Sequence, residues 1–265
     1  MRAIWANDVH LEFLDDGKLD RFLGKMRAEN ADCVLLGGDI AQADSIERYL
    51  SILEDRLKRP IHFVLGNHDY YKGSIRGVRS QVSRCVRQSK HLNWLGSRGV
   101  VELAPNTCLI GHDGWGDGRV GNFGNPEVLL NDFFLIEELR DLKPEELRRA
   151  LQKLGDEAAD HLRKWLPDAL EEYGHVVVLI HVSPFIESSW FAGRPSDENW
   201  RPYFVCDAAG RVLREAMAAN QDRRMTVLCG HTHGGGICEI LPNLTVHTGP
   251  ARYGRPRIQK VFEWG

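Results

Sequence analysis

The chain has 265 residues, of which 43% are hydrophobic and 27% are charged, a composition typical of globular proteins. Its formal net charge of −3 argues against a general nucleic-acid-binding protein, because such proteins are usually basic. The six cysteines form no CxxC pair, which argues against a zinc ribbon, and no apolar run reaches the about 18 residues of a membrane span.

The N-terminal part of the chain alternates short apolar runs with amphipathic stretches. Strands are predicted at residues 3–5, 32–36 and 61–65, and helices at about 17–30, 45–57 and 74–89. This order predicts a parallel sheet built of right-handed crossovers. Because the first strand starts almost at Met1, no room is left for a signal peptide, and a soluble cytoplasmic protein is expected.

The second part of the chain continues in the same way. Strands are predicted at about 100–103, 107–111, 175–180 and 225–229, with closing strands near 237–241, 244–248 and 258–262. Residues 131–173 carry an apolar stripe at helical spacing, which predicts a mainly helical insertion that covers an edge of the sheet. A further helix is expected at about 208–220. No repeat or low-complexity linker divides the chain, so a single domain over residues 1–265 is expected.

Five of the predicted strands end on side chains that can bind a metal ion. These side chains are Asp8 with His10, Asp39, Asn67, His181, and His231 with His233. Each strand end alone is also consistent with a polar turn. Parallel strands bring their carboxyl ends to one edge of the sheet, so the seven side chains are expected to converge. Seven ligands are too many for one tetrahedral zinc ion, and they suit two five- or six-coordinate ions that share a bridging carboxylate. Imidazole and oxygen donors without thiolate favour Mn, Fe or Zn as these ions.

The order of these motifs resembles that of the calcineurin-like metallophosphoesterase superfamily. The motifs are Asp8-x-His10, Gly38-Asp39, Gly66-Asn67-His68-Asp69, His181 and Gly230-His231-x-His233, and they span most of the chain. The resemblance implies an α/β fold, a four-layer α/β/β/α sandwich with two divalent metal ions at the strand carboxyl ends. It also implies two ligand sets that share Asp39. One set is Asp8, His10, Asp39 and His233, and the other is Asp39, Asn67, His181 and His231.

The resemblance further implies hydrolysis of phosphate esters, with His68 assisting the leaving group. Asp69 is a second catalytic candidate, and the alternative is that it holds or polarises this neighbourhood. Two divalent ions can share a bridging hydroxide as nucleophile, and manganese is the metal expected to support activity in vitro. Gln42 and Ala43 replace an Asp and an Arg that phosphoprotein phosphatases carry after the second motif. This departure favours a small phosphohydrolase or phosphodiesterase. It leaves phosphomonoesters and phosphodiesters both open, with a slight preference for diesters.

Substrate choice is expected to lie in three loops, at residues 112–119, 183–204 and 249–257. Trp115, Arg119 and Arg252 are the candidate substrate-binding residues, for stacking on a base and for clamping a phosphate. The alternative is that Trp115 packs in the interior and that both arginines are surface charges.

The expected partner is a small organic or nucleotide phosphate ester, and no membrane partner is expected. A metal-dependent nuclease remains an alternative that the net charge of −3 does not favour. A catalytically silent scaffold of the same fold is a further alternative. It is not favoured either, because every metal-ligand position of the motifs is filled.

Overall fold

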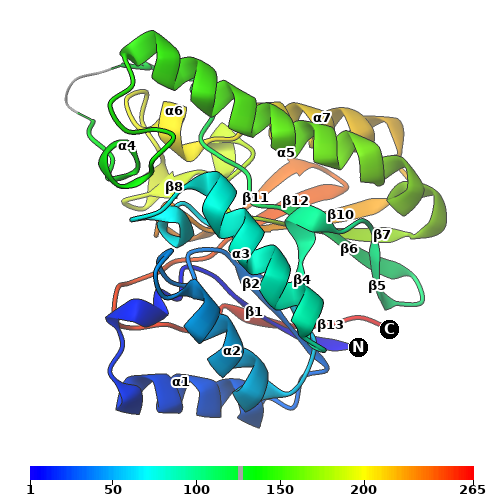
Figure 1. Ribbon diagram of the computed structural model, residues 1–265. Coiled ribbons are helices and arrows are strands. Elements are labelled where there is room, and N and C mark those ends of the chain that lie inside the picture. The colour runs from blue at the N-terminus through cyan, green and yellow to red at the C-terminus, as the bar shows by residue number, and fades with distance from the viewer. Residues whose placement is uncertain (125–127) are drawn as a thin grey trace.

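Two β-sheets lie face to face at the centre of the molecule, and helices cover the outer face of each sheet (Figure 1). The structure is a computed structural model that describes residues 1–124 and 128–265. The two sheets and two helical layers form the α/β/β/α sandwich expected from the sequence, so the predicted fold class is confirmed.

The first sheet has five strands in the order β13-β1-β2-β3-β4. The strands β1 (Arg2–Ala6), β2 (Cys33–Gly37), β3 (Ile61–Val64) and β4 (Leu92–Trp94) are parallel, and β13 (Lys260–Glu263) is antiparallel to β1. Three helices cover its outer face, namely α1 (Asp16–Ala28), α2 (Ile46–Leu57) and α3 (Ile75–Gln88). The predicted order of strand, helix and strand therefore produces the expected parallel pairing.

The second sheet has six strands in the order β11-β12-β10-β7-β6-β5. They are β11 (Gly236–Leu241), β12 (Leu244–Thr248), β10 (Arg224–Cys229), β7 (His175–Ile180), β6 (Thr107–His112) and β5 (Val101–Ala104). The four inner strands are parallel, and the two outer strands are antiparallel to their neighbours. Helices α5 (Pro144–Glu172) and α7 (Asp207–Ala219) cover its outer face.

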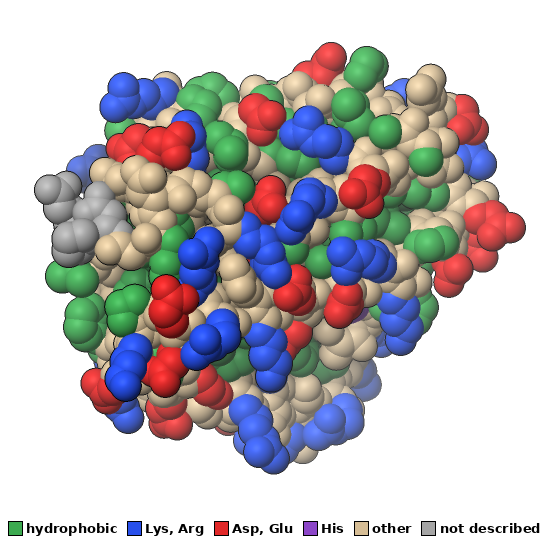
Figure 2. All heavy atoms as spheres, turned by 90° about the horizontal axis from the view of Figure 1, so that it is seen from above, with side chains coloured by type: hydrophobic (Ala, Val, Ile, Leu, Met, Phe, Trp, Pro, Cys, Tyr) green, Lys and Arg blue, Asp and Glu red, His purple; other side chains and the backbone are tan. Residues whose placement is uncertain are grey.

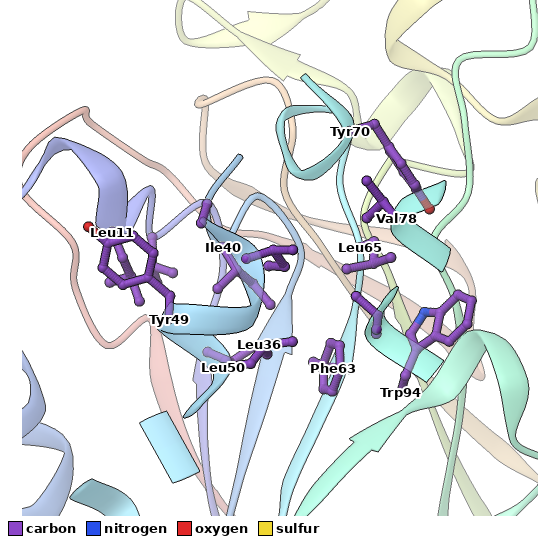
Figure 3. Close-up of a cluster of buried hydrophobic side chains, with 14 of the residues drawn as sticks. Leu11, Leu36, Ile40, Tyr49, Leu50, Phe63, Leu65, Tyr70, Val78 and Trp94 are labelled. Carbon is purple, nitrogen blue, oxygen red and sulfur yellow. The ribbon is translucent and has the colours of Figure 1, made fainter. Parts of the chain in front are cut away.

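Alternate residues of each inner strand face different layers, which explains why these strands read as continuous apolar runs. In β1, Ile4 faces the helical layer, whereas Trp5 lies between the two sheets. In β7, Val178 faces α5 and α7, and Val177 lies between the sheets. Figure 3 shows the cluster between the first sheet and its helices, where Leu36 and Phe63 lie among the buried side chains.

The stretch predicted as a helical insertion at residues 131–173 has a different place from the one expected. It contains the one-turn helix α4 (Asp132–Leu135) and the long helix α5, separated by residues 136–143. Helix α5 lies beside α7 on the face of the second sheet, and not over its edge (Figure 1). Its apolar stripe, including Leu162 and Leu166, packs in the core of this layer.

The remaining elements are too short to be read from periodicity. They are α6 (Arg201–Phe204), the hairpin of β8 (Trp190–Phe191) and β9 (Arg194–Pro195), and the one-turn helices η1 (Leu11–Phe13), η2 (His68–Tyr70), η3 (Leu95–Ser97) and η4 (Ile186–Ser188). None of the helices within the described ranges combines the length and the apolar character needed to cross a membrane. Figure 2 views the face that α5 covers, where acidic and basic side chains are interspersed and form no large patch of one sign.

A buried carboxylate joins the two sheets near the polar ends of their strands. Asp113 follows β6 and is 1% exposed. Its Oδ1 accepts hydrogen bonds from Leu65 N at 2.8 Å and Trp94 Nε1 at 2.9 Å, and its Oδ2 accepts one from Tyr70 OH at 2.8 Å. These three donors belong to the segments around β3 and β4, so Asp113 ties the first sheet to the second.

The Asp113→Ala variant is therefore expected to be strongly destabilised. It leaves three donors without their acceptor, and each unsatisfied buried polar group costs about 1–3 kcal/mol. The expected loss in the free energy of unfolding is at least about 3 kcal/mol, measured by urea denaturation. Asp160→Ala is the control, because the Asp160 side chain is 73% exposed and pairs with Arg163 on the same helix. Equal denaturation midpoints for the two variants would contradict this account.

Candidate active site

The polar groups that follow β1, β2 and β3 in the first sheet meet those that follow β7 and β10 in the second sheet. All seven side chains predicted as metal ligands lie at this common rim. They form two groups of close contacts, and Asp39 takes part in both.

The first group consists of Asp8, His10, Asp39 and His233. One nitrogen or carboxylate oxygen from each of them lies within 4.8 Å of the others. His10 Nε2 lies 3.2 Å from His233 Nε2 and 3.6 Å from Asp39 Oδ2. His233 Nε2 lies 3.7 Å from Asp8 Oδ1. Two oxygen-bearing and two nitrogen-bearing side chains therefore surround one point.

The second group consists of Asn67, His181, His231 and the other oxygen of Asp39. Asn67 Oδ1 lies 3.0 Å from His231 Nδ1 and 3.2 Å from His181 Nε2. His181 Nε2 also lies 3.4 Å from Asp39 Oδ1. Since Asp39 Oδ2 faces the first group, this one carboxylate lies between the two groups.

Contacts outside the second group fix which atoms point inward. His181 Nδ1 lies 2.8 Å from Gly37 O, and His231 Nε2 lies 3.1 Å from Tyr203 O. A carbonyl oxygen only accepts, so each of these nitrogens carries the hydrogen, and the other ring nitrogen presents its lone pair to the centre. Asn67 Nδ2 donates to Asp132 Oδ1 at 2.8 Å, which turns Asn67 Oδ1 inward.

This set of donors fits a divalent cation. Acceptor atoms that face one another at about 3 Å repel, and a cation between them converts the repulsion into ligand bonds. Burial, and then the neighbouring Asp8 and Asp69, raise the pKa of Asp39 well above its ordinary value. Burial also lowers the pKa of His10 and of His231, which keeps both imidazoles neutral and available as ligands.

The backbone of the rim is strained at the positions of these side chains. Positive φ angles occur at Asp8 (47°), His10 (41°), Asp39 (50°), His231 (72°) and His233 (58°). Non-glycine residues adopt this left-handed conformation at a cost of about 1–3 kcal/mol each, and such strain concentrates at functional sites. The backbone conformations that place five of the seven predicted ligands therefore lower the stability of the fold.

Gly66 allows the loop after β3 to approach the loop after β2. A Cβ atom at Gly66 would lie 2.2 Å from Asp39 Oδ1 and 2.6 Å from Asp39 N. Both distances are far below van der Waals contact, so a side chain at this position would displace the central carboxylate.

His68 and Asp69 have different surroundings, although they are adjacent in the chain. His68 lines the pocket at the rim, its ring lies 4.6 Å from that of His10, and its Nε2 lies 3.3 Å from Tyr253 OH. Burial lowers the pKa of His68 to about 3. Asp69 is fully buried and accepts backbone N–H groups of Ile40, Ala41 and Gly66, each at 2.8 Å. These contacts fit one of the two roles considered for Asp69, that of holding the loops in place, and its direct catalytic role stays a prediction.

The pocket over the two groups has a volume of about 280 Å³. Its lining includes His68, the apolar or aromatic side chains of Leu129, Phe191, Phe204 and Tyr253, and four of the candidate ligands, namely Asp39, Asn67, His231 and His233. A larger cavity of about 840 Å³ lies beside Asn106, Asn243 and Glu263, away from the candidate ligands. The smaller pocket is therefore the candidate active-site pocket, because candidate ligands and His68 line it.

Two of the three predicted substrate-binding residues lie away from this pocket. Trp115 is 4% exposed and packs against Tyr70 at a ring distance of 5.7 Å. Arg119 pairs with Asp117 at 3.1 Å and with Asp156 at 2.7 Å. The expectation that they bind substrate is corrected, because each is already engaged in packing or ion pairs. Arg252 is exposed and adjacent to Tyr253, which does line the pocket.

Of the three predicted substrate loops, the second and third supply pocket walls. Residues 183–204 contribute Phe191 and Phe204, and residues 249–257 contribute Tyr253. Sequence reasoning missed these side chains individually, because an aromatic residue in an irregular segment carries no periodic signal. It also missed Asp132 and Glu12, whose low exposure the sequence does not reveal.

Comparisons with known proteins agree with this architecture. Solved structures with similar folds include a dimetal phosphatase from Danio rerio, with 16% identity and a TM-score of 0.58 over 94% of this chain and 87% of that chain. A phosphopantetheinyl hydrolase from Mycobacterium tuberculosis has 13% identity and a TM-score of 0.59 over 96% and 90% of the two chains. The protein TT1561 of Thermus thermophilus has 14% identity and a TM-score of 0.55 over 94% and 88%.

At these identities the solved structures show the fold alone. No protein with a curated description matches the chain significantly. A family model described as calcineurin-like phosphoesterase matches residues 1–235, the range that holds both groups of candidate ligands. The chain therefore belongs to the calcineurin-like phosphoesterase family and is a phosphoester hydrolase.

Proposed function

We propose that the chain hydrolyses phosphodiesters of small organic molecules at a centre of two divalent metal ions. The observation that carries this proposal is the pair of ligand groups that share Asp39. We assign Asp8, His10, Asp39 and His233 to one ion. Asp39, Asn67, His181 and His231 are assigned to the other. Bound there, the two ions would supply charge neutralisation at the phosphate and lower the pKa of water.

The oxygen and nitrogen donors set the choice of metal. Imidazole, amide and carboxylate ligands without a thiolate suit Mn, Fe or Zn, and we propose Mn as the ion that supports activity in vitro. The carbonyl groups of Gly37 and Tyr203 hold His181 and His231 in the tautomers that a metal requires.

His68 is proposed to act on the leaving group. It lines the pocket beside both ligand groups, and a neutral imidazole retains one N–H that can be donated to the ester oxygen. Tyr253 OH lies 3.3 Å from His68 Nε2. Donation to an oxygen on which negative charge develops stabilises the transition state more than the ground state.

The walls of the pocket favour diesters over monoesters. Among the described residues, no Lys or Arg lines the pocket. Residues 125–127 are Asn, Pro and Glu, so they supply no cationic side chain either. A monoester dianion carries a second charge, which a side-chain cation commonly pairs with. The apolar wall of Leu129, Phe191 and Phe204 would instead contact the organic group of a diester.

The wild-type protein with Mn is expected to hydrolyse bis-p-nitrophenyl phosphate, and Asn67→Ala and His231→Ala are each expected to reduce kcat/KM at least about 100-fold. Each substitution removes a ligand from the second group. Asn122→Ala is the matched control, because Asn122 is exposed and its side chain contacts Asn199, away from the ligand groups. Activity that persists in both ligand variants would contradict the assignment.

Removal of metal is expected to abolish hydrolysis and to lower the melting temperature. A ligand that binds only the folded state stabilises it by about 2.7 kcal/mol at 100 times its dissociation constant. Relief of the repulsion between Asp8 and Asp39 contributes to this gain. The measurement is differential scanning fluorimetry before and after dialysis against EDTA, followed by addition of Mn. A melting temperature insensitive to both steps would count against a metal centre.

The diester preference is tested with two chromogenic substrates that share a leaving group. The value of kcat/KM for bis-p-nitrophenyl phosphate is expected to exceed that for p-nitrophenyl phosphate at least about tenfold, which corresponds to about 1.4 kcal/mol. Preference for the monoester would refute the diester assignment while leaving the metal assignment intact. Cleavage of single-stranded DNA faster than of either small substrate would favour the nuclease alternative.

A further inference from the structure

Glu12 carries a largely buried carboxylate that has no part in the proposed chemistry. It lies on η1, which begins directly after His10. The backbone there is tied to the loop after β2, because His10 N and Leu11 N donate to Asp39 O and Ile40 O at 3.0 and 2.9 Å. The Glu12 side chain is 12% exposed. Its position is therefore fixed relative to the first ligand group.

Unpartnered polar atoms gather around Glu12. In the described part of the chain, ten buried side-chain nitrogen or oxygen atoms lack a hydrogen-bond partner. Four of the ten belong to only three neighbouring side chains, as Glu12 Oε1 and Oε2, His10 Nδ1 and His68 Nδ1. One nitrogen or carboxylate oxygen from each of these three side chains lies within 4.8 Å of the others. An imidazole N–H donates a hydrogen bond and a carboxylate oxygen accepts one, so a carboxylate beside imidazoles is chemically suited to pair with one of them.

The other rim histidines show what His10 lacks. His181 and His231 each direct one ring nitrogen to a backbone carbonyl and the other to the centre. His10 Nε2 faces the first ligand group, but its Nδ1 has no hydrogen-bond partner among the described residues. The carboxylate facing that nitrogen is Glu12, whose Oε1 lies 3.7 Å away.

We propose that Glu12 is a positioning residue that accepts a hydrogen bond from His10 Nδ1–H and so directs His10 Nε2 as a metal ligand. The inference rests on the metal assignment of the proposed function. It includes a small rotation of the side chains, because 3.7 Å is longer than a hydrogen bond. A carboxylate behind a ligating histidine fixes its tautomer and raises its basicity.

The test measures binding of Mn to the metal-free protein by isothermal titration calorimetry. The wild type is expected to bind two ions. Glu12→Ala is expected to weaken one of the two by about 10–100-fold and to leave the other unchanged, because His10 belongs to only one ligand group. Glu12→Gln is expected to lose less affinity, since its amide oxygen still accepts a hydrogen bond.

Asp44→Asn is the matched control for charge. Asp44 is the nearby acid whose charge acts on Glu12, but its side chain is 61% exposed and pairs with Lys72. Removal of this charge is expected to leave both Mn affinities unchanged. If Asp44→Asn weakens Mn binding as much as Glu12→Gln does, the effect comes from the loss of negative charge near the site and not from a contact of Glu12 with His10. That result overturns the positioning role.

Thermal melting separates positioning from a merely structural role. A buried carboxylate without a partner costs free energy, so metal-free Glu12→Gln is expected to melt at or above the wild-type temperature. The stabilisation that Mn gives to this variant is expected to be smaller than in the wild type. A structural role would lower the metal-free melting temperature instead, and that result overturns the inference.

Failure of the role proposed for Glu12 and failure of the proposed function give different results. A wild type that binds two ions but hydrolyses no ester would refute the proposed function and leave the role of Glu12 standing, provided that Glu12→Ala weakens one ion. Unchanged binding of both ions by Glu12→Ala, in a protein that hydrolyses diesters, would overturn the role of Glu12 alone.

Discussion

The carboxylate of Asp39 is the group around which the rim is built. It is almost fully buried, it lies between two clusters of acceptor atoms, and its own residue is in a left-handed conformation. Burial of a charge in this setting is costly unless an opposite charge compensates it. The surrounding loops accommodate the carboxylate, since Gly66 leaves room for it and His68 N donates to it at 2.9 Å.

Two further aspartates hold the loops that carry the candidate ligands. Asp69 binds the backbone of Ile40, Ala41 and Gly66, and so joins the loops after β2 and β3. Asp113 joins β3 and β4 to the second sheet. Buried carboxylates thus serve two purposes in this fold, because some face the centre and others satisfy backbone donors behind it. Their residue type alone does not separate these purposes.

The sequence was sufficient for the fold class and for locating the rim. Apolar runs that end on polar groups predict strands, and parallel pairing then brings residues as distant as Asp8 and His233 to one edge. The sequence did not decide whether Trp115 and Arg119 bind substrate, because the burial of Trp115 and the ion pairs of Arg119 depend on which side chains of α5 and the loops lie beside them. Nor does it show that Glu12 is largely buried, since a glutamate on a short surface turn looks the same in sequence.

The candidate ligands come from both sheets, so the order in which the sheets form decides when the rim is complete. Asp8, His10, Asp39 and Asn67 follow strands of the first sheet, whereas His181, His231 and His233 follow strands of the second. During synthesis the members that follow the first sheet emerge well before those that follow the second. Each group contains a histidine that follows β10, so neither group is complete until β10 has docked. Under the proposed assignment, the metal ions would therefore bind late in folding and stabilise the finished sandwich.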